Sequence, residues 1–281
     1  MFFSGIADEA GNPIETQIRA HKELGWNHVE VRNVNSTTLA YAEDQEFDSI
    51  RAALDNSGIT VSCFASQIAN WSRDIFGPFQ KDVDELRRAM PRMKVMGTPF
   101  IRVMSYANKS NVAVVEWHAE AIRRLRELAK MAEQGGVMLL HENCDGWGGL
   151  GPEQTLELLA QVNSPALKLV FDTGNPVHHE QDSWDYYSKV RKHVVYVHIK
   201  DGNRGADGHT RFCYPGKGAG AVQRILKNLI NSGYTGGLSI EPHIAAMVQE
   251  AKQSSPEDAY RTYVEYGRRL MRLVEEERQR P

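Results

Sequence analysis

The chain has 281 residues, of which 41% are hydrophobic and 25% are charged, and its formal net charge is −3. This composition excludes a disordered chain, a collagen-like repeat and a low-complexity scaffold. A slightly acidic chain has no positive field to attract phosphate backbones or anionic lipid. We therefore expect neither nucleic acid nor a membrane surface as a partner.

The three cysteines, Cys63, Cys144 and Cys213, are far apart and form no CxxC pair. Their spacing supports neither a disulfide framework nor a structural zinc site. At the start of the chain, Asp8 and Glu9 occur before any apolar stretch is long enough for export or for a membrane span. We expect a cytoplasmic protein.

Short apolar runs rich in β-branched residues alternate along the chain with longer stretches whose apolar residues recur at helical spacing. In chain order, the predicted strands are Phe2–Ala7, His28–Arg32, Thr60–Ala65, Phe100–Met104, Val137–Leu140, Lys168–Phe171, Val194–His198 and Gly237–Ile240. The predicted helices that follow them are Ile14–Leu24, Gln45–Asn56, Lys81–Met96, Val112–Gln134, Pro152–Gln161, Trp184–Lys189, Ala221–Asn231 and Pro256–Glu277. Glycines stand where a left-handed residue would end four of these helices, at Gly25, Gly58, Gly97 and Gly233.

Strands that alternate with helices through short connections form parallel sheets with right-handed crossovers. Eight units of about 35 residues each fit a closed (β/α)8 barrel, and an open, doubly wound sheet is the alternative. No Pro/Ser-rich linker or shift in composition divides residues 1–281. We therefore predict an α/β fold with one domain, a single (β/α)8 TIM barrel.

Polar side chains occur where four successive predicted strands end, and in a barrel of this kind those ends carry the active site. The residues are Glu142, Asp172, His198 and Glu241, from the fifth to the eighth strand. Three carboxylates at a dry barrel mouth would repel one another unless a divalent cation neutralised them. We predict that these four side chains bind one metal ion. Oxygen-rich ligation with one imidazole favours Mn²⁺, with Mg²⁺, Co²⁺ and Zn²⁺ as alternatives.

Six motifs lie at or near the predicted strand ends: GWNHVEVR at 25–32, HEN at 141–143, FDTGN at 171–175, HIKD at 198–201, PGKGAG at 215–220 and GYTGGLSIEP at 233–242. In these motifs, and over nearly its whole length, the chain resembles the xylose isomerase-like TIM barrels. That superfamily includes sugar phosphate isomerases and epimerases, D-tagatose 3-epimerase-type enzymes, inosose dehydratase and endonuclease IV. The resemblance implies that Glu142, Asp172, His198 and Glu241 are the metal ligands.

The resemblance also implies a metal-dependent isomerase or epimerase that acts on a keto sugar or polyol derivative. Glu142 and Glu241 would be the catalytic acid and base, moving a proton off and onto a carbon beside a metal-bound carbonyl. A divalent ion stabilises the negative charge that develops on the carbonyl oxygen, and carboxylates on opposite faces permit inversion. The alternative is a lyase that uses the same site to eliminate water from a keto-inositol or an aglycone from a keto-glycoside.

Further polar and aromatic residues near the strand ends are candidates for contacting a small carbohydrate substrate: Arg204, Lys200, His178, Asn175, Arg32 and Trp147. Arg204 matches an arginine that contacts substrate in the epimerases, with a plain surface arginine as the alternative. Asn175 stands where several relatives have histidine, and His178 or His179 would substitute. Trp147 or Trp71 would stack on a sugar ring. For Glu30 a structural role is favoured.

Two alternatives keep the fold but change the function. Endonuclease IV uses three zinc ions, which need additional histidines at strand ends where this chain has Cys63, Arg102 and Asn175; an endonuclease IV-like nuclease is therefore a remote alternative. The other is a barrel that binds a ligand without catalysis. Relatives are frequently dimers or tetramers, so a homo-oligomer is also compatible with the sequence.

Overall fold

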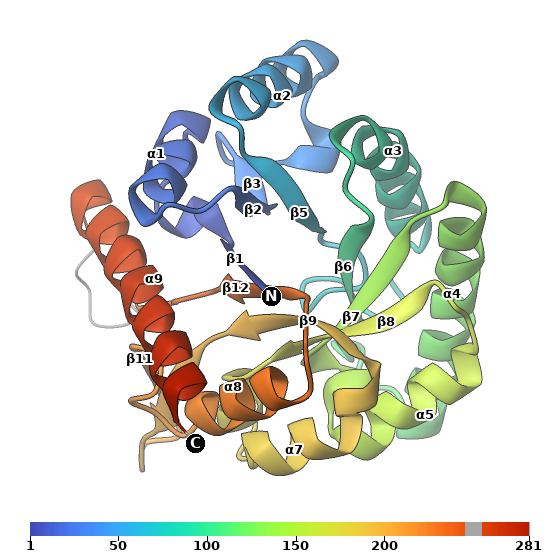
Figure 1. Cartoon of the computed structure of the whole chain (residues 1–281). Helices are drawn as coiled ribbons and strands as arrows, with labels where there is room; N and C mark the ends of the chain where they lie inside the picture. The colour runs from blue at the N-terminus through green and yellow to red at the C-terminus, as the bar shows by residue number, and fades with distance from the viewer. Residues whose placement is uncertain (245–254, 281) are drawn as a thin grey trace.

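The centre of the computed structural model, which describes residues 1–244 and 255–280, is an eight-stranded parallel sheet. Its strands follow the order β1-β12-β9-β8-β7-β6-β5-β2. Ile6, which follows β1, forms a parallel bridge with Glu30 in β2, so the two ends of the sheet meet. The chain is a single (β/α)8 TIM barrel, as the sequence predicts (Figure 1).

The barrel strands are β1 (Phe2–Gly5), β2 (His28–Val31), β5 (Thr60–Ala65), β6 (Phe100–Ser105), β7 (Met138–Gly146), β8 (Leu167–Asp172), β9 (Val194–Ile199) and β12 (Gly237–Ile240). The helices around them are α1 (Ile14–Leu24), α2 (Asp44–Ser57), α3 (Gln80–Met96), α4 (Val114–Gly135), α5 (Pro152–Val162), α7 (Ser183–Val190), α8 (Val222–Asn231) and α9 (Pro256–Gln279). They form an outer ring in which α9 packs between α8 and α1 (Figure 1). Among the described residues, no helix has the length and hydropathy needed to cross a bilayer.

Helix ends follow the expected chemistry. Gly25, Gly58, Gly97 and Gly233 have φ angles of 70°, 66°, 67° and 70°. These left-handed conformations carry no steric penalty in glycine, so the chain turns sharply from each helix toward the next strand. The apolar faces of the helices then cover the outer surface of the strands, and most of the buried apolar residues form one large core. A second, smaller cluster consists of Cys63, Leu140, Val170 and Tyr196.

The main departures from the predicted elements lie at the carboxyl end of the barrel. Strand β7 continues to Gly146, well beyond the predicted end at Leu140, because β8 pairs with it as far as Glu142 and β6 pairs with Gly146 beyond a bulge. Strand β1 ends earlier than predicted, since Ala7–Glu9 forms a 3-10 helix. Small elements extend the rim: the hairpins β3/β4 (Asn33–Val34, Thr37–Thr38) and β10/β11 (Asp201–Arg204, Thr210–Cys213), and the helix α6 (Asn175–His178).

Candidate metal centre

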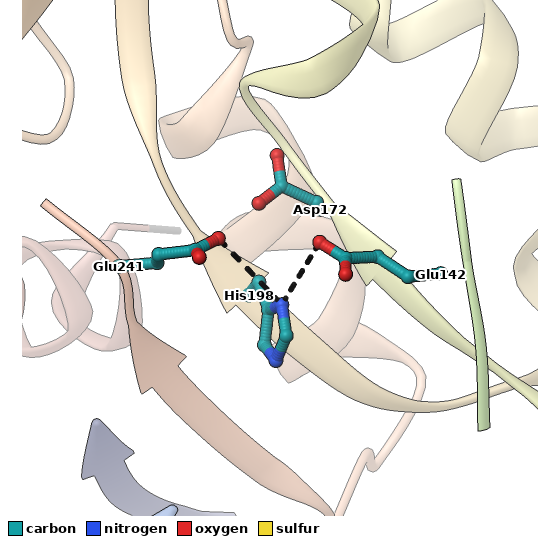
Figure 2. Close-up of side chains that lie close together, drawn as sticks. All are labelled: Glu142, Asp172, His198 and Glu241. Carbon is teal, nitrogen blue, oxygen red and sulfur yellow. Dashed lines mark hydrogen bonds and ion pairs between the residues drawn. The ribbon is translucent and has the colours of Figure 1, made fainter. Parts of the chain in front are cut away.

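The four predicted ligands lie together at the carboxyl end of the barrel. Glu142 lies in β7, Asp172 ends β8, His198 lies in β9 and Glu241 follows β12. All four are buried, and one ligand atom of each lies within 4.8 Å of the others. Glu142 and Glu241 lie on opposite sides of the His198 ring, with Asp172 across from it (Figure 2).

The backbone fixes which oxygen of Asp172 faces the other ligands. Its Oδ1 accepts hydrogen bonds from the N–H groups of Gly174 at 2.8 Å and Asn175 at 2.7 Å. The side chain of Asn143 in β7 bonds both backbone groups of Asp172, at 2.7 and 2.9 Å. Oδ2 is therefore the oxygen left to bind a cation.

These residues fit a divalent metal ion. Oδ2 of Asp172 and Oε2 of Glu142 are buried and accept no hydrogen bond within the described part of the chain. Lys200 Nζ lies 3.0 Å from the first oxygen and Arg102 Nη1 lies 3.3 Å from the second, but neither contact is a hydrogen bond, so each oxygen keeps a lone pair for a cation. Three carboxylates and one imidazole also form a donor set that binds Mn²⁺, Mg²⁺, Co²⁺ or Zn²⁺.

Positive side chains surround the carboxylates. Arg102 Nη1 lies 3.3 Å from Glu142 Oε2, and Lys200 Nζ lies 3.0 Å from Asp172 Oδ2 and 2.9 Å from Glu241 Oε2. Burial opposes ionisation of Glu142, but Arg102 and His198 outweigh it and hold its pKa at about 2. Burial likewise opposes ionisation of Glu241, yet Lys200 and its other neighbours lower that pKa well below the usual range. Both glutamates are therefore carboxylates at neutral pH.

A buried glutamate holds the far side of the His198 ring. Nδ1 of His198 lies 3.3 Å from Glu142 Oε1, and Nε2 lies 3.0 Å from Glu30 Oε2. Ser239 donates a hydrogen bond of 2.6 Å to the same oxygen of Glu30. Burial lowers the pKa of His198, but Glu30 and Glu142 raise it well above the usual range. Because Glu30 fixes Nε2, Nδ1 is directed toward the three carboxylates.

Arg32 lies beside the candidate metal centre. Its Nη1 is 3.2 Å from Glu241 Oε1, and its Nε donates to Asp8 at 3.0 Å. Glu9, Glu241 and His243 form a second group of side chains close enough to hold a cation. Arg32 also lies 3.5 Å from Glu9, so a guanidinium already supplies positive charge to both carboxylates of that group.

The remaining predicted contacts lie at different places around the site. Asn175 donates a hydrogen bond of 3.2 Å to Glu142 Oε1, and His178 lines the cavity above the four ligands. Arg204 lies farther out on β10, where it pairs with Glu180 at 2.8 Å.

Trp147 is buried and stacks on His118 with 4.2 Å between ring centroids. It lies outside the cavity lining, so the expected stacking on a sugar ring is corrected to a packing role.

The cavity over the centre has a volume of about 830 Å³. Its wall includes four of the predicted contacts, namely Arg32, Lys200, Asn175 and His178. Sequence reasoning missed Arg102 as a partner of Glu142, and for Glu30 it favoured a structural role without predicting the contact with His198. The available signal was a charged side chain inside a largely apolar strand: Arg102 in β6, with the sequence FIRVMS, and Glu30 in β2, with the sequence HVEV.

The glycine-rich motif at 215–220 has a structural explanation. Asp201 accepts hydrogen bonds from the backbone N–H groups of Gly202, Gly216, Gly218 and Gly220, at 2.8 to 3.0 Å. A Cβ atom at Gly218 would lie 2.4 Å from Asp201 Oδ1, and one at Gly220 would lie 2.8 Å away. Only glycine lets this loop wrap the carboxylate, and the loop in turn fixes the backbone beside Lys200.

Comparisons with known proteins agree with this architecture. The model of a family described as xylose isomerase-like TIM barrel matches residues 18–277. The chain is 28% identical over 186 residues to 2-epi-5-epi-valiolone 7-phosphate 2-epimerase from Actinoplanes sp.; the match covers 65% of this chain and 64% of that enzyme, just under two thirds of its length. It is 23% identical over 259 residues to inosose dehydratase 1 from Bacillus cereus, with 83% of each chain covered.

Among solved structures, a xylose isomerase-like TIM barrel protein from Mycobacterium smegmatis in complex with magnesium has the same fold. The TM-score is 0.71 at 19% sequence identity, and the match covers 98% of this chain and 97% of that one.

Proposed function

The chain belongs to the xylose isomerase-like TIM barrel family, and from that premise we propose that it is a divalent-metal-dependent isomerase or epimerase of a keto sugar or polyol derivative. One observation carries the proposal: two buried glutamates, Glu142 and Glu241, lie on opposite sides of a site that also contains Asp172 and His198 (Figure 2). The relatives named an epimerase and a dehydratase support an enzyme acting on sugars or cyclitols.

Glu142, Asp172, His198 and Glu241 would hold the metal, with Mn²⁺ as the first candidate. When bound, a divalent ion supplies positive charge that stabilises the negative charge developing on a substrate carbonyl oxygen. The surrounding arginine and lysine side chains keep the two glutamates ionised, which is the form in which a carboxylate acts as a base.

The type of reaction then depends on which carbon receives the proton. One glutamate can carry a proton between adjacent carbons, which isomerises the sugar. Inversion at one carbon needs a protonated group on the opposite face. Lys200 Nζ, 2.9 Å from Glu241 Oε2, keeps that glutamate ionised, so inversion would require Glu241 or Glu142 to take up a proton before returning it to the carbon. Asn175 donates a hydrogen bond to Oε1 of Glu142, and Arg32 donates one to Oε1 of Glu241. These two bonds orient the carboxylates.

The cavity walls favour a small polar substrate. Arg32, Lys200, Asn175 and His178 offer donors to hydroxyl or carbonyl oxygens. The net charge of −3 gives no general attraction for a nucleic acid, so we propose a small carbohydrate as the substrate.

The first experiment counts metal in the purified protein and in the Glu142→Gln and Glu241→Gln variants by elemental analysis. We expect about one divalent ion per chain and less in either variant. Solvent deuterium exchange into a panel of keto sugars then tests the reaction, with exchange in the wild type and at least 100-fold slower exchange in either variant. Protein without metal, or with about three zinc ions per chain, would contradict the proposal.

A lyase is the second candidate, favoured by the similarity to inosose dehydratase 1 over most of both chains. Abstraction of the same proton would be followed by loss of a group from the β-carbon. The mass of the product separates the two candidates, because isomerisation conserves mass whereas dehydration removes water.

A further inference from the structure

A second cavity adjoins the one over the metal centre. Its volume is about 570 Å³, and the two cavities share Trp71, Cys144, Asp145 and His179 in their walls. The first cavity, at about 830 Å³, already lies in the upper part of the range of roughly 300–1,000 Å³ typical of sites for drug-sized ligands. A monosaccharide is much smaller than such ligands, so the connected space exceeds what one sugar ring fills.

Trp71 stands where the two cavities meet and is 56% exposed, which is unusual for so large an apolar side chain. It occupies a tight turn in which the Arg73 N–H donates to the Asn70 carbonyl at 3.0 Å. The Asn70 side chain closes the turn by accepting hydrogen bonds from Ser72 N and Oγ at 3.0 and 2.6 Å. Lys109, from the loop after β6, donates to the Ser72 carbonyl at 3.2 Å. The backbone that carries the exposed indole is therefore fixed before any ligand arrives.

The walls of the second cavity combine apolar and polar groups. Trp117 and Leu150 contribute apolar surface, and the Trp117 ring is fixed because its Nε1 donates to the Tyr106 carbonyl at 3.0 Å. The Asp145 carboxylate pairs with His179 Nε2 at 3.2 Å at the boundary between the cavities. Such a wall suits a sugar ring, since the C–H face of the ring stacks on an aromatic side chain while its hydroxyls bond to polar groups.

We propose that the second cavity is a subsite for a second sugar ring, so that the substrate is a keto sugar that carries a glycosyl substituent rather than a free monosaccharide. This inference rests on the proposed function, because the reacting ring occupies the metal centre. The substituent lies past the Asp145–His179 pair and stacks on Trp71.

The test compares D-fructose with isomaltulose, a fructose that carries a glucosyl group, as ligands of the metal-loaded full chain in titration calorimetry. We expect isomaltulose to bind at least about tenfold more tightly than fructose. Trp71→Ala and Leu150→Arg should reduce that ratio to about one, and Trp71→Phe should restore much of it. Phe76→Ala is the matched control, because Phe76 is 54% exposed but lies outside both cavity walls; the ratio should not change in that variant.

Equal affinity for the two sugars in the wild type, or a ratio that Trp71→Ala leaves unchanged, would overturn the subsite. Metal-dependent deuterium exchange into fructose would then still support the proposed function. Failure of both sugars to bind, together with no exchange across the sugar panel, would reject both proposals. Light scattering tests whether a second copy of the chain occupies this surface instead. A dimer that Trp71→Ala converts to a monomer would assign the surface to that second copy and overturn the subsite.

Discussion

Replacing Glu30 by glutamine tests whether this buried carboxylate sets the metal affinity through His198. The substitution keeps the size of the side chain and removes its charge. Glu30 is fully buried, lies 3.0 Å from Nε2 of His198 and accepts a second hydrogen bond from Ser239. An amide holds the imidazole N–H less strongly than a carboxylate does and makes the ring a weaker donor to a metal.

The expected loss of metal affinity follows from the position of Glu30, which contacts His198 on the side of the ring away from the three carboxylates. Substituting a carboxylate that supports a metal-bound histidine lowers metal affinity by roughly 10–100-fold, which corresponds to about 1.4–2.8 kcal/mol. Glu30 makes these contacts inside the barrel, where no water replaces the lost charge, so we expect a value in the upper half of that range.

The assay is titration of Mn²⁺ into chelator-treated protein, followed by calorimetry, with circular dichroism to verify the fold. Glu85→Gln is the matched control. Glu85 lies in α3 and is equally buried, but it pairs with Arg73 and with the backbone N–H of Gln67, not with His198. That variant should lose stability while its metal affinity stays within about twofold. An unchanged Mn²⁺ affinity in folded Glu30→Gln protein would refute the reasoning.

Three further predictions concern charge and stability. Lys200→Met removes a cation that lies 3.0 Å from Asp172 and 2.9 Å from Glu241, so Mn²⁺ affinity, measured by competition with a chelator, should rise about tenfold or more; weaker binding would mean that the ammonium mainly orients the carboxylates. Asp201→Ala leaves four backbone N–H groups without their acceptor and should cost about 3 kcal/mol in urea unfolding, whereas Asp207→Ala on the same hairpin should change stability by less than about 0.5 kcal/mol. Burial lowers the pKa of His21 to about 4, below its unfolded value of about 6.5; the unfolded chain then binds more protons between these values, and this histidine alone should lower the free energy of unfolding by about 2 kcal/mol from pH 7 to pH 5. Burial lowers the pKa of His141 to about 4 as well, so His21→Gln should reduce that slope without removing it, and an unchanged slope would argue against the neutral buried imidazole.

Much of the architecture follows from local sequence signals. The alternation of β-branched runs with helical periodicity predicted all eight barrel strands, and the glycines at 25, 58 and 97 have the left-handed conformation that ends a helix. Boundaries at the barrel mouth were less accurate. Strand β7 continues through His141, Glu142 and Asn143 because its neighbours pair with it there, and pairing between strands is not encoded in the apolar period of one strand.

The sequence by itself determined the barrel and the four side chains that its strand ends bring together, because each of these side chains stands at the end of a recognisable apolar run. Only the tertiary structure decided what surrounds them. Glu30 reaches His198 from β2, and Arg102 reaches Glu142 from β6, across separations that no local pattern records. Trp147 follows β7 close to Glu142 in sequence, yet it packs against His118 of α4, because a large aromatic ring gains more from burial in the core than from exposure at the rim.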